Sequence, residues 1–486
     1  MQATPVPQQD PGSVVTFSDM GADPLVHLER IMSEVYLPLL SNPRNQEGWG
    51  DVTAKELMDK LHGFLSQLSI TVGQTKGETC LQLPKVKEST QDMAAGSASG
   101  SLDMKDRVHL LEGAVITWTK QIKSVLKQDP EALLKAGKHP PPMVEIKFWR
   151  NKADNLNAIF DQLQSERIRR VLHFLDSARS TYCTPFAKLC KEVFAARLEA
   201  NDNVKYLRTL DSWFGRLAND SSYEELHKLF KPVMHILLLI WKNSKFYNTP
   251  ARLVVVIREV CNAIIDQSTS FVSGKQIFGL LEDEEEKEAV AKLQETLRVC
   301  GEFKSAYAEY KATANSECPE NPWRIQNNAL FLRLDAFIER CYDVLEMTEI
   351  IIKFSRLEKI VVGGTKGEVL TTTVRRIFDD FKRTKAALEH VEYDILDVEA
   401  KGFDTDFFAF RQSIKELERR LASVMTQGFD DQSTISGRFK LLDSFDMLLE
   451  RPIIQDELER KHIALVHAYG SDLKRVQEIF LTEREQ

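Results

Sequence analysis

The stretch EIKFWRNKADNLNAIFDQLQSERIRRVLHFLDSARSTYCTPFAKLCKEVFAARLEANDNVKYLRTL, residues 145–210, indicates the fold class of the chain. Apolar residues recur in it at spacings of three and four, as on one face of an α-helix. Two sets follow this spacing: Leu156, Ile159, Phe160 and Leu163, then Ile168, Val171, Leu172 and Leu175. Charged and amide side chains fill the positions between them, which suits a solvated face. We therefore predict consecutive amphipathic helices here.

The same helical pattern runs through the rest of the chain. Segments that follow it are 253–265, 332–352, 374–388, 407–425, 439–449 and 456–479. Ser222 with Glu225 reads as a capping box, and Thr249-Pro250 reads as an N-cap followed by an N1 proline. Residues 71–84 contain Val and Thr and suit a short strand or hairpin. We predict an all-α chain of elongated, stacked helical bundles, with minor β structure near the N-terminus.

Composition marks the breaks between the parts of the chain. Residues 1–22 are rich in Pro, Gln, Gly and Ser, residues 88–101 are small and polar, and a proline triplet stands at 140–142. The predicted parts are a disordered N-terminus (1–22), a small helical dimerisation-type region (23–87), a flexible linker (88–101), a helical segment (102–137), a proline hinge (138–144) and the helical bundles (145–486).

Three apolar stripes precede these bundles, and they are the candidate partner-binding residues. They extend over 25–39, 57–68 and 108–125. Each can pack inside its own subunit or form a seam with another chain, and so short a heptad run cannot specify a coiled coil alone. We hypothesise that the stripes contact another chain. The residues concerned are Leu25, Leu28, Met32, Val35, Leu57, Leu61, Phe64, Val108, Leu111, Val115, Trp118 and Ile122.

The bulk composition argues against several classes of protein. At 486 residues the chain can hold two to four domains. Its net charge of −8 speaks against a dedicated nucleic-acid binder, because neutralising phosphates needs clustered Lys and Arg. The seven cysteines include no Cys-x-x-Cys pair, so reduced thiols in a cytosolic-type compartment are expected. The most apolar run, 232–241, is too short to cross a membrane, and the N-terminus does not read as a signal peptide.

No stretch matches a catalytic, cofactor or metal site. The run GGTKG at 363–367 lacks the Ser or Thr that follows the lysine of a phosphate-binding P-loop, so we predict a turn between helices. His227 and His235 are too far apart for two ligands on one helical face. Asp404 and Asp406 lack the rest of a calcium loop. We expect no enzymatic activity, cofactor or metal within these residues.

For two groups of side chains, the sequence is compatible both with a structural role and with a role in binding a partner. Basic residues gather on the helices of 145–170, where they can be solvated, paired within the chain, or a docking face for an acidic partner. They are Lys147, Arg150, Lys152, Arg167, Arg169 and Arg170. Tryptophans are expected in the core, and an exposed one would be a hot-spot candidate. The four considered are Trp149, Trp213, Trp241 and Trp323.

Several motifs follow one another in a fixed order after residue 145. They are Phe148-Trp149-Arg150, the 156–163 face, Ser180-x-Tyr182, 199–207 (EANDNVKYL), 334–340 (LDAFIER), 354–359 (FSRLEK), the 363–367 turn, Phe403-Asp404, 417–421 (LERRL) and 448–452 (LLERP). In this order they resemble the N-terminal tail of dynein heavy chains. The resemblance covers about 145–479 and is greatest to axonemal outer-arm heavy chains of the gamma type.

This resemblance implies an assembly role. Such a tail associates with other dynein heavy chains, binds intermediate and light chains, and docks through a docking complex to the doublet microtubule of a cilium or flagellum. It implies a location in the cytoplasm, cytoskeleton and axoneme, with no nucleic-acid or membrane partner. Because the motor's ATP site is absent here and the closing LTEREQ carries no terminal signal, we expect a longer polypeptide. The alternatives are a cytoplasmic dynein tail for cargo transport, or an unrelated helical-rod subunit of a vesicle tether.

Overall fold

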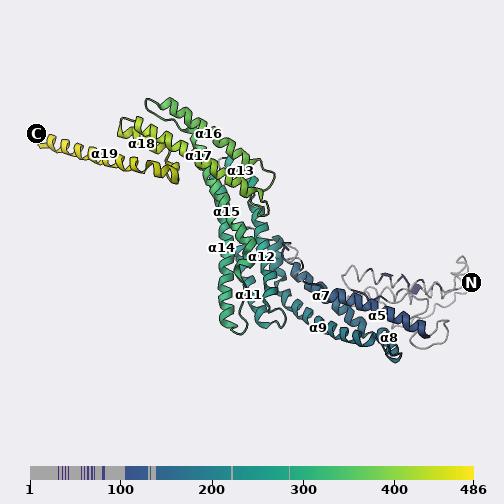
Figure 1. Cartoon of the computed structure of the whole chain (residues 1–486). Helices are drawn as coiled ribbons and strands as arrows, with labels where there is room; N and C mark the ends of the chain where they lie inside the picture. Colours follow the sequence, from purple (N-terminus) through teal and green to yellow (C-terminus); the bar gives the residue numbers. More distant parts are fainter. Residues whose placement is uncertain are drawn as a thin grey trace, which may run out of the picture. The chain divides into compact units, whose positions relative to one another are not determined.

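A computed structural model of the chain describes isolated positions from 31 to 71, then 79–82, 104–129, 132, 138–220, 223–283 and 285–485. Every regular element in these ranges is a helix, which confirms the all-α prediction (Figure 1). Within the segment predicted to hold a strand, Thr71 is helical and residues 79–82 have no regular structure. The predicted disordered terminus, the 88–101 linker and most of 23–87 lie outside the described residues.

The contacts divide the chain into two compact units. Unit 1 consists of Met1–Asp129 with Phe148–Val204, and unit 2 consists of Pro130–Lys147 with Lys205–Gln486. The division therefore falls twice inside a helix, in α7 (Val144–Gln164) and in α9 (Cys183–Leu207). The predicted proline hinge belongs to unit 2. There the Asn262 side chain donates a hydrogen bond of 2.9 Å to the carbonyl of buried Pro140, while Lys138, His139 and Pro141 are exposed.

Unit 1 is built from α5 (Met104–Leu126), most of α7, α8 (Glu166–Ser177) and most of α9. The two predicted apolar faces are confirmed: Leu156 and Ile159 of α7 are fully buried, as is Leu175 of α8. Residues 79–82 lie against α7, where the Leu81 amide donates to the Gln162 side chain at 2.7 Å. The same Gln162 donates back to the Thr79 carbonyl at 2.9 Å, so the backbone of this short segment finds partners on a helix.

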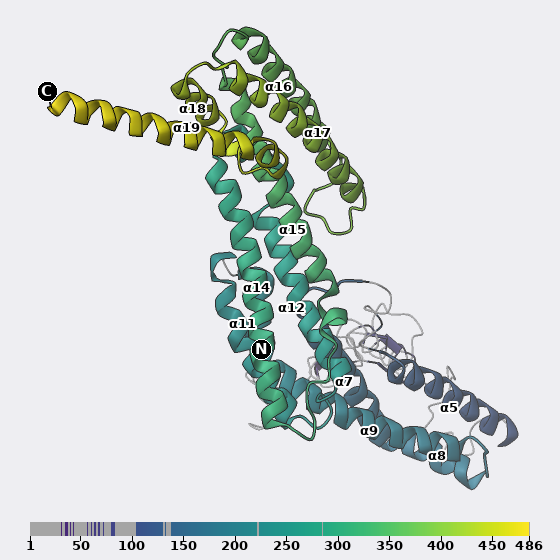
Figure 2. The ribbon, with the colours of Figure 1, turned by 60° about the vertical axis from the view of Figure 1, so that its left-hand side comes forward.

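Unit 2 contains the remaining helices. They are α10 (Asp211–Gly215), α11 (His227–Asn243), α12 (Pro250–Phe271), α13 (Gly274–Glu282), α14 (Glu286–Glu317), α15 (Asn327–Ser355), α16 (Gly367–Glu389), α17 (Gly402–Asp431), α18 (Ile435–Ser444) and α19 (Pro452–Glu485). Helices α11, α12, α14 and α15 pack lengthwise, and α16 pairs with α17 (Figure 2). Several neighbours in sequence are thus neighbours in space, as short connections favour.

Local sequence signals account for the starts of two helices in unit 2. Thr249 is the N-cap of α12 and Pro250 stands at its first position, as predicted. A capping box opens α13, where the Ser273 hydroxyl accepts from the Gln276 amide and the Gln276 side chain accepts from the Ser273 amide. Such reciprocal bonds satisfy backbone donors that the first turn of a helix leaves without a partner.

The capping box predicted at Ser222 is wrong for α11. Tyr223–Glu225 form a short 3-10 turn, and the residue at the N-cap of α11 is Leu226. Ser222 itself lies outside the described residues. The spacing of a serine and a glutamate was therefore not sufficient to locate the start of this helix, because helices often begin through a tighter 3-10 turn.

Aromatic side chains fill the middle of unit 2. The rings of Trp241 and Trp323 meet edge to face with centroids 6.1 Å apart, and Tyr307 packs on Phe331 at 5.0 Å. The apolar run 232–241 lies in α11 and faces this core, and burial there accounts for its apolar composition. No helix among the described residues is long and apolar enough to span a bilayer.

Three of the four tryptophans considered lie in the core, as predicted. Trp241 and Trp323 are almost fully buried in unit 2, and Trp149 is almost fully buried in unit 1. Trp213 of α10 is half-buried, and the Arg216 guanidinium lies 5.8 Å from its ring centroid. None of the four is therefore the fully exposed tryptophan that would suggest an interaction hot spot.

Candidate interaction surfaces

The structure separates the twelve predicted partner-binding residues into three groups. Leu111, Val115, Trp118 and Ile122 are buried inside unit 1, where α5 packs on α8. Val108 is half-buried at the start of the same helix. Val35 and Phe64 are exposed. The remaining five lie outside the described residues: Leu25, Leu28, Met32, Leu57 and Leu61.

The buried part of the α5 stripe is held by contacts within its own subunit. The Trp118 ring lies 6.1 Å from the Phe186 ring of α9, measured between centroids. Its indole N–H donates to the carbonyl of Gln82 at 2.5 Å, and Gln121 donates to the carbonyl of Cys80 at 3.1 Å. The stripe could pack inside its own subunit or form a seam with another chain, and the structure shows the first arrangement. These side chains are therefore not available to another chain in this arrangement.

The predicted basic residues do not form one solvated face. Lys152 is buried, lies 5.5 Å from the Trp149 ring centroid, and donates to the Gln128 carbonyl at 2.7 Å. Arg170 pairs with Glu166 one turn away on α8, where both side chains are well exposed. Lys152 thus belongs to the interior of unit 1. An exposed ion pair such as that of Arg170 with Glu166 adds little to the stability of the fold.

The GGTKG run forms the predicted turn between helices, just ahead of α16. Gly364 has φ of 103°, and a Cβ there would come within 2.4 Å of an Asp431 oxygen. The Asp431 carboxylate accepts from the Lys366 amide at 2.8 Å and from the Thr365 hydroxyl. These bonds hold the pKa of Asp431 below its usual range. The backbone amide that a phosphate would need is therefore already bound by a carboxylate of the same chain.

Asp431→Asn is expected to loosen this turn. A neutral amide is a weaker acceptor, so the amides of Lys366 and the first turn of α16 should exchange faster with deuterium. Because the folded-state pKa is lowered, the carboxylate stabilises the turn above the unfolded pKa of about 3.9, and this contribution is lost as pH falls through the folded pKa. Hydrogen exchange at pH 7 measures the effect. Asp430→Asn is the matched control, because Asp430 pairs with Lys461 instead.

The paired acids of α17 have structural partners. Asp404 pairs with Arg340 at 3.1 Å, and Asp406 accepts from the Tyr393 hydroxyl. Among the described residues, no group of three or more His, Cys, Asp and Glu side chains could hold a metal ion. Asp404 and Asp406 therefore join α17 to its neighbours.

One buried polar cluster had no signal in the sequence. Glu145 at the start of α7 and Glu259 in α12 are both almost fully buried in unit 2. The Glu145 amide donates to the Glu259 carboxyl at 2.6 Å, and the Tyr247 hydroxyl donates to the Glu145 carboxyl at 2.9 Å. Burial, with the nearby Glu145 charge as a smaller cause, raises the pKa of Glu259 to about 9. Glu259 is therefore neutral in the folded protein at pH 7.

Exposed apolar side chains gather on two helices. On α9 they are Phe194 and Leu198, and the Phe194 ring lies 6.0 Å from the Phe160 ring of α7. On α19 they form a longer series in the second half of the helix. The sequence predicts the α19 helix, and its apolar residues have a spacing of three and four, but this pattern alone assigns no interaction surface to it. Helical periodicity shows that a face is apolar, and only packing shows whether it is covered.

The comparisons with known proteins give the family. The family model described as dynein heavy chain, N-terminal region 1, matches residues 108–486. The chain is 46% identical, over 99% of its length, to the dynein beta chain of the flagellar outer arm of Chlamydomonas reinhardtii. It is 32% identical, over 98% of its length, to the ciliary dynein beta chain of Tripneustes gratilla. It is 31% identical, over 98% of its length, to human dynein axonemal heavy chain 9.

Two features of these relatives qualify the match. The chain spans about a tenth of their length: 10% of the Chlamydomonas protein and 11% of each of the other two. The first two are named beta chains, so they do not support the gamma type suggested by the sequence motifs. Since the family model matches well over half of the chain, this chain belongs to the dynein heavy-chain family and corresponds to its N-terminal tail region.

Proposed function

We propose that this chain is the tail of an axonemal outer-arm dynein heavy chain and that its work is assembly. It associates with a neighbouring heavy chain, carries intermediate and light chains, and anchors the motor to the doublet microtubule of a cilium or flagellum. The observation that carries this proposal is the 46% identity, over almost the whole chain, to a protein named for the flagellar outer arm. ATP hydrolysis belongs to the motor part of the longer heavy chain, and this region needs no cofactor of its own.

The helical architecture suits such a role. Long helices packed lengthwise expose extended surfaces, which fit subunits better than small molecules. The turn with the sequence nearest to a phosphate-binding loop is closed by Asp431. Force produced in the motor must pass through this region, and a packed helical body transmits it because its interior is close-packed.

A pull-down from salt-extracted axonemes tests the proposal, with the tagged chain as bait and mass spectrometry as readout. We expect outer-arm intermediate chains or a second dynein heavy chain among the proteins recovered. An excess of untagged chain should compete them away. Recovery of cytoplasmic cargo adaptors or vesicle-tethering subunits alone would overturn the axonemal assignment.

A double variant tests the predicted contact near the N-terminus. Val35→Ser with Phe64→Ser removes two exposed apolar side chains and should lower recovery of the second heavy chain by about tenfold, because interface anchors contribute about 1 kcal/mol or more each. Leu332→Ser is the matched control, since Leu332 is an exposed apolar residue of α15. Equal recovery by both variants would show that Val35 and Phe64 do not contact the other chain.

A further inference from the structure

The last helix carries the most extensive exposed apolar face among the described residues. Eight large apolar side chains of α19, which we call the α19 stripe, are between 47% and 64% exposed. They are Ile463, Val466, Tyr469, Leu473, Val476, Ile479, Phe480 and Leu481. A contiguous apolar surface of this kind marks an interaction site in a soluble protein.

The α19 stripe has the spacing of a helix-packing seam. Five of its members follow one another at intervals of three, four, three and four residues, from Val466 to Phe480. The polar residues Ser471, Arg475 and Glu478 fall on the opposite side of the helix. The stripe therefore presents one continuous apolar face, as the packed helices of unit 2 do.

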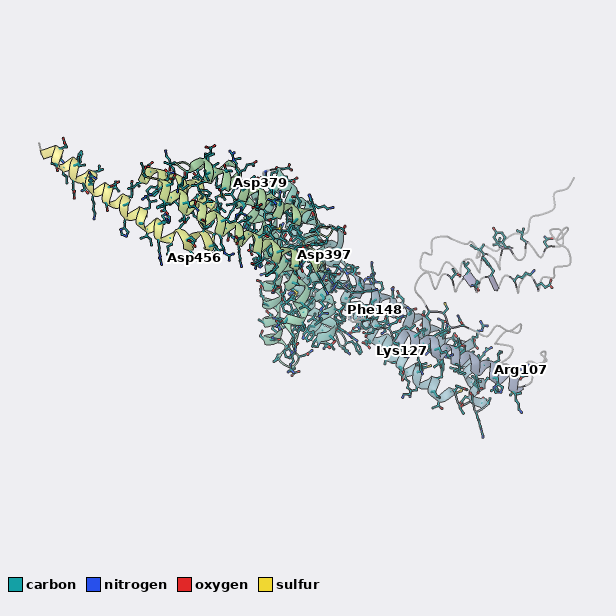
Figure 3. All side chains as sticks on the ribbon, turned by 45° about the horizontal axis from the view of Figure 1, so that its top comes forward. Arg107, Lys127, Phe148, Asp379, Asp397 and Asp456 are labelled. Atoms are coloured by element: carbon teal, nitrogen blue, oxygen red, sulfur yellow. The ribbon has the colours of Figure 1, made fainter. Side chains whose placement is uncertain are left out.

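Only the first half of α19 is covered. Ile454, Leu458 and Leu465 are buried, and α19 packs there on α17 and α18. Further along, the Tyr469 ring still contacts the Phe439 ring of α18, at 5.7 Å between centroids. In Figure 3 the helix runs on from Asp456 until its side chains stand clear of the other helices of unit 2.

A groove joins the stripe to the body of unit 2. Its volume is about 890 Å³, and its lining includes Met447, Leu449 and Leu458 together with Ile463 and Val466 of the stripe. The lining also holds charged and polar side chains, among them Lys353, Glu450 and His462. A groove of mixed lining that continues into an apolar helix face fits an amphipathic helix laid along both.

We propose that the α19 stripe is the packing surface for the next helix of the longer heavy chain. This inference rests on the proposed function, because it takes the chain as one region of a longer polypeptide. The relatives are about ten times as long as this chain. Within unit 2, α14 packs on α15 and α16 packs on α17, so a helix is covered by its neighbour in sequence.

Two further arguments favour the same polypeptide over a separate chain. A helical segment of about 15 residues without tertiary contacts is only marginally stable in water, so the end of α19 needs a covering surface before any partner arrives. A segment joined by a short turn is present at an effective concentration in the millimolar range. The covering helix runs antiparallel to α19. It carries basic side chains opposite Asp472, which lies beside the stripe.

Hydrogen exchange on two proteins tests the proposal: the chain 1–486 and the isolated parent heavy chain, both at low concentration. Amides of 470–485 should exchange on the order of 100-fold more slowly in the parent chain. Exchange that is equally fast in both proteins would overturn the proposal. So would protection that depends on protein concentration, which would point to a second copy, or protection that appears only after other dynein subunits are added.

Leu473→Ser with Val476→Ser gives a second measurement. In the parent chain this double variant should lose the protection of 470–485, whereas Leu332→Ser on α15 should not. In the axonemal pull-down, the stripe variant of 1–486 should recover the same subunits as the unaltered chain. Loss of those subunits would show that the stripe binds another protein, which overturns this inference and leaves the proposed function intact.

Discussion

Replacing Trp118 with alanine is expected to destabilise unit 1 by about 3–5 kcal/mol. The side chain is fully buried, contacts the Phe186 ring and satisfies the Gln82 carbonyl. Its removal leaves a cavity between α5, α9 and residues 79–82, and the carbonyl loses its donor. Hydrogen exchange of the α5 amides measures the loss, because this probe reports on unit 1 even when the whole chain does not unfold in one step.

Met104→Ala is the control on the same helix. Met104 is exposed, so its replacement should change stability by no more than about 0.5 kcal/mol. A contact between the α5 stripe and another chain would give a different result. If Trp118→Ala abolished recovery of a second heavy chain while the α5 amides kept their protection, the stripe would face another chain and the arrangement described for unit 1 would be incorrect.

The helices could be predicted because the signal is local. The faces at 156–163 and 168–175 are read from spacing alone, and the structure buries them. The α5 and α19 stripes show the limit of this signal. Both have alternating three and four spacing, yet Trp118 is covered by Phe186 and Gln82, whereas Val476 is exposed. Which stripe is covered depends on residues far away in the sequence.

The division between the units could not be predicted from the sequence. A proline triplet predicts a hinge at 138–144, and this stays a prediction; the Pro140 carbonyl there accepts from Asn262, 122 residues later. Besides the boundary between Asp129 and Pro130, the division lies inside α7 and α9, where composition does not change. The buried Glu259 was missed for a similar reason. It stands in an apolar run of α12, and its partner Glu145 is 114 residues away.

Stability of unit 2 is expected to fall as pH rises from about 5 to about 9, and Glu259→Gln should remove this dependence. The pKa of Glu259 is raised to about 9 in the folded protein, against about 4.3 for an unfolded chain. Between these values the folded state binds a proton that the unfolded state has lost. Each pH unit in this window therefore costs up to about 1.4 kcal/mol of stability. The variant should be more stable than the unaltered protein at pH 8, and the difference should shrink toward pH 5.

The pH dependence of stability can be measured by hydrogen exchange of the α12 amides at about pH 5.5, 7 and 8.5. These values span the window between the unfolded-state and folded-state pKa of Glu259. Glutamine keeps an oxygen for the Glu145 amide and replaces the protonated oxygen with a neutral N–H₂ group. Glu349→Gln, at an exposed position of α15, should leave the pH dependence unchanged. If Glu259→Gln kept the full pH dependence, Glu259 would not be the group that binds this proton, and the prediction would be wrong.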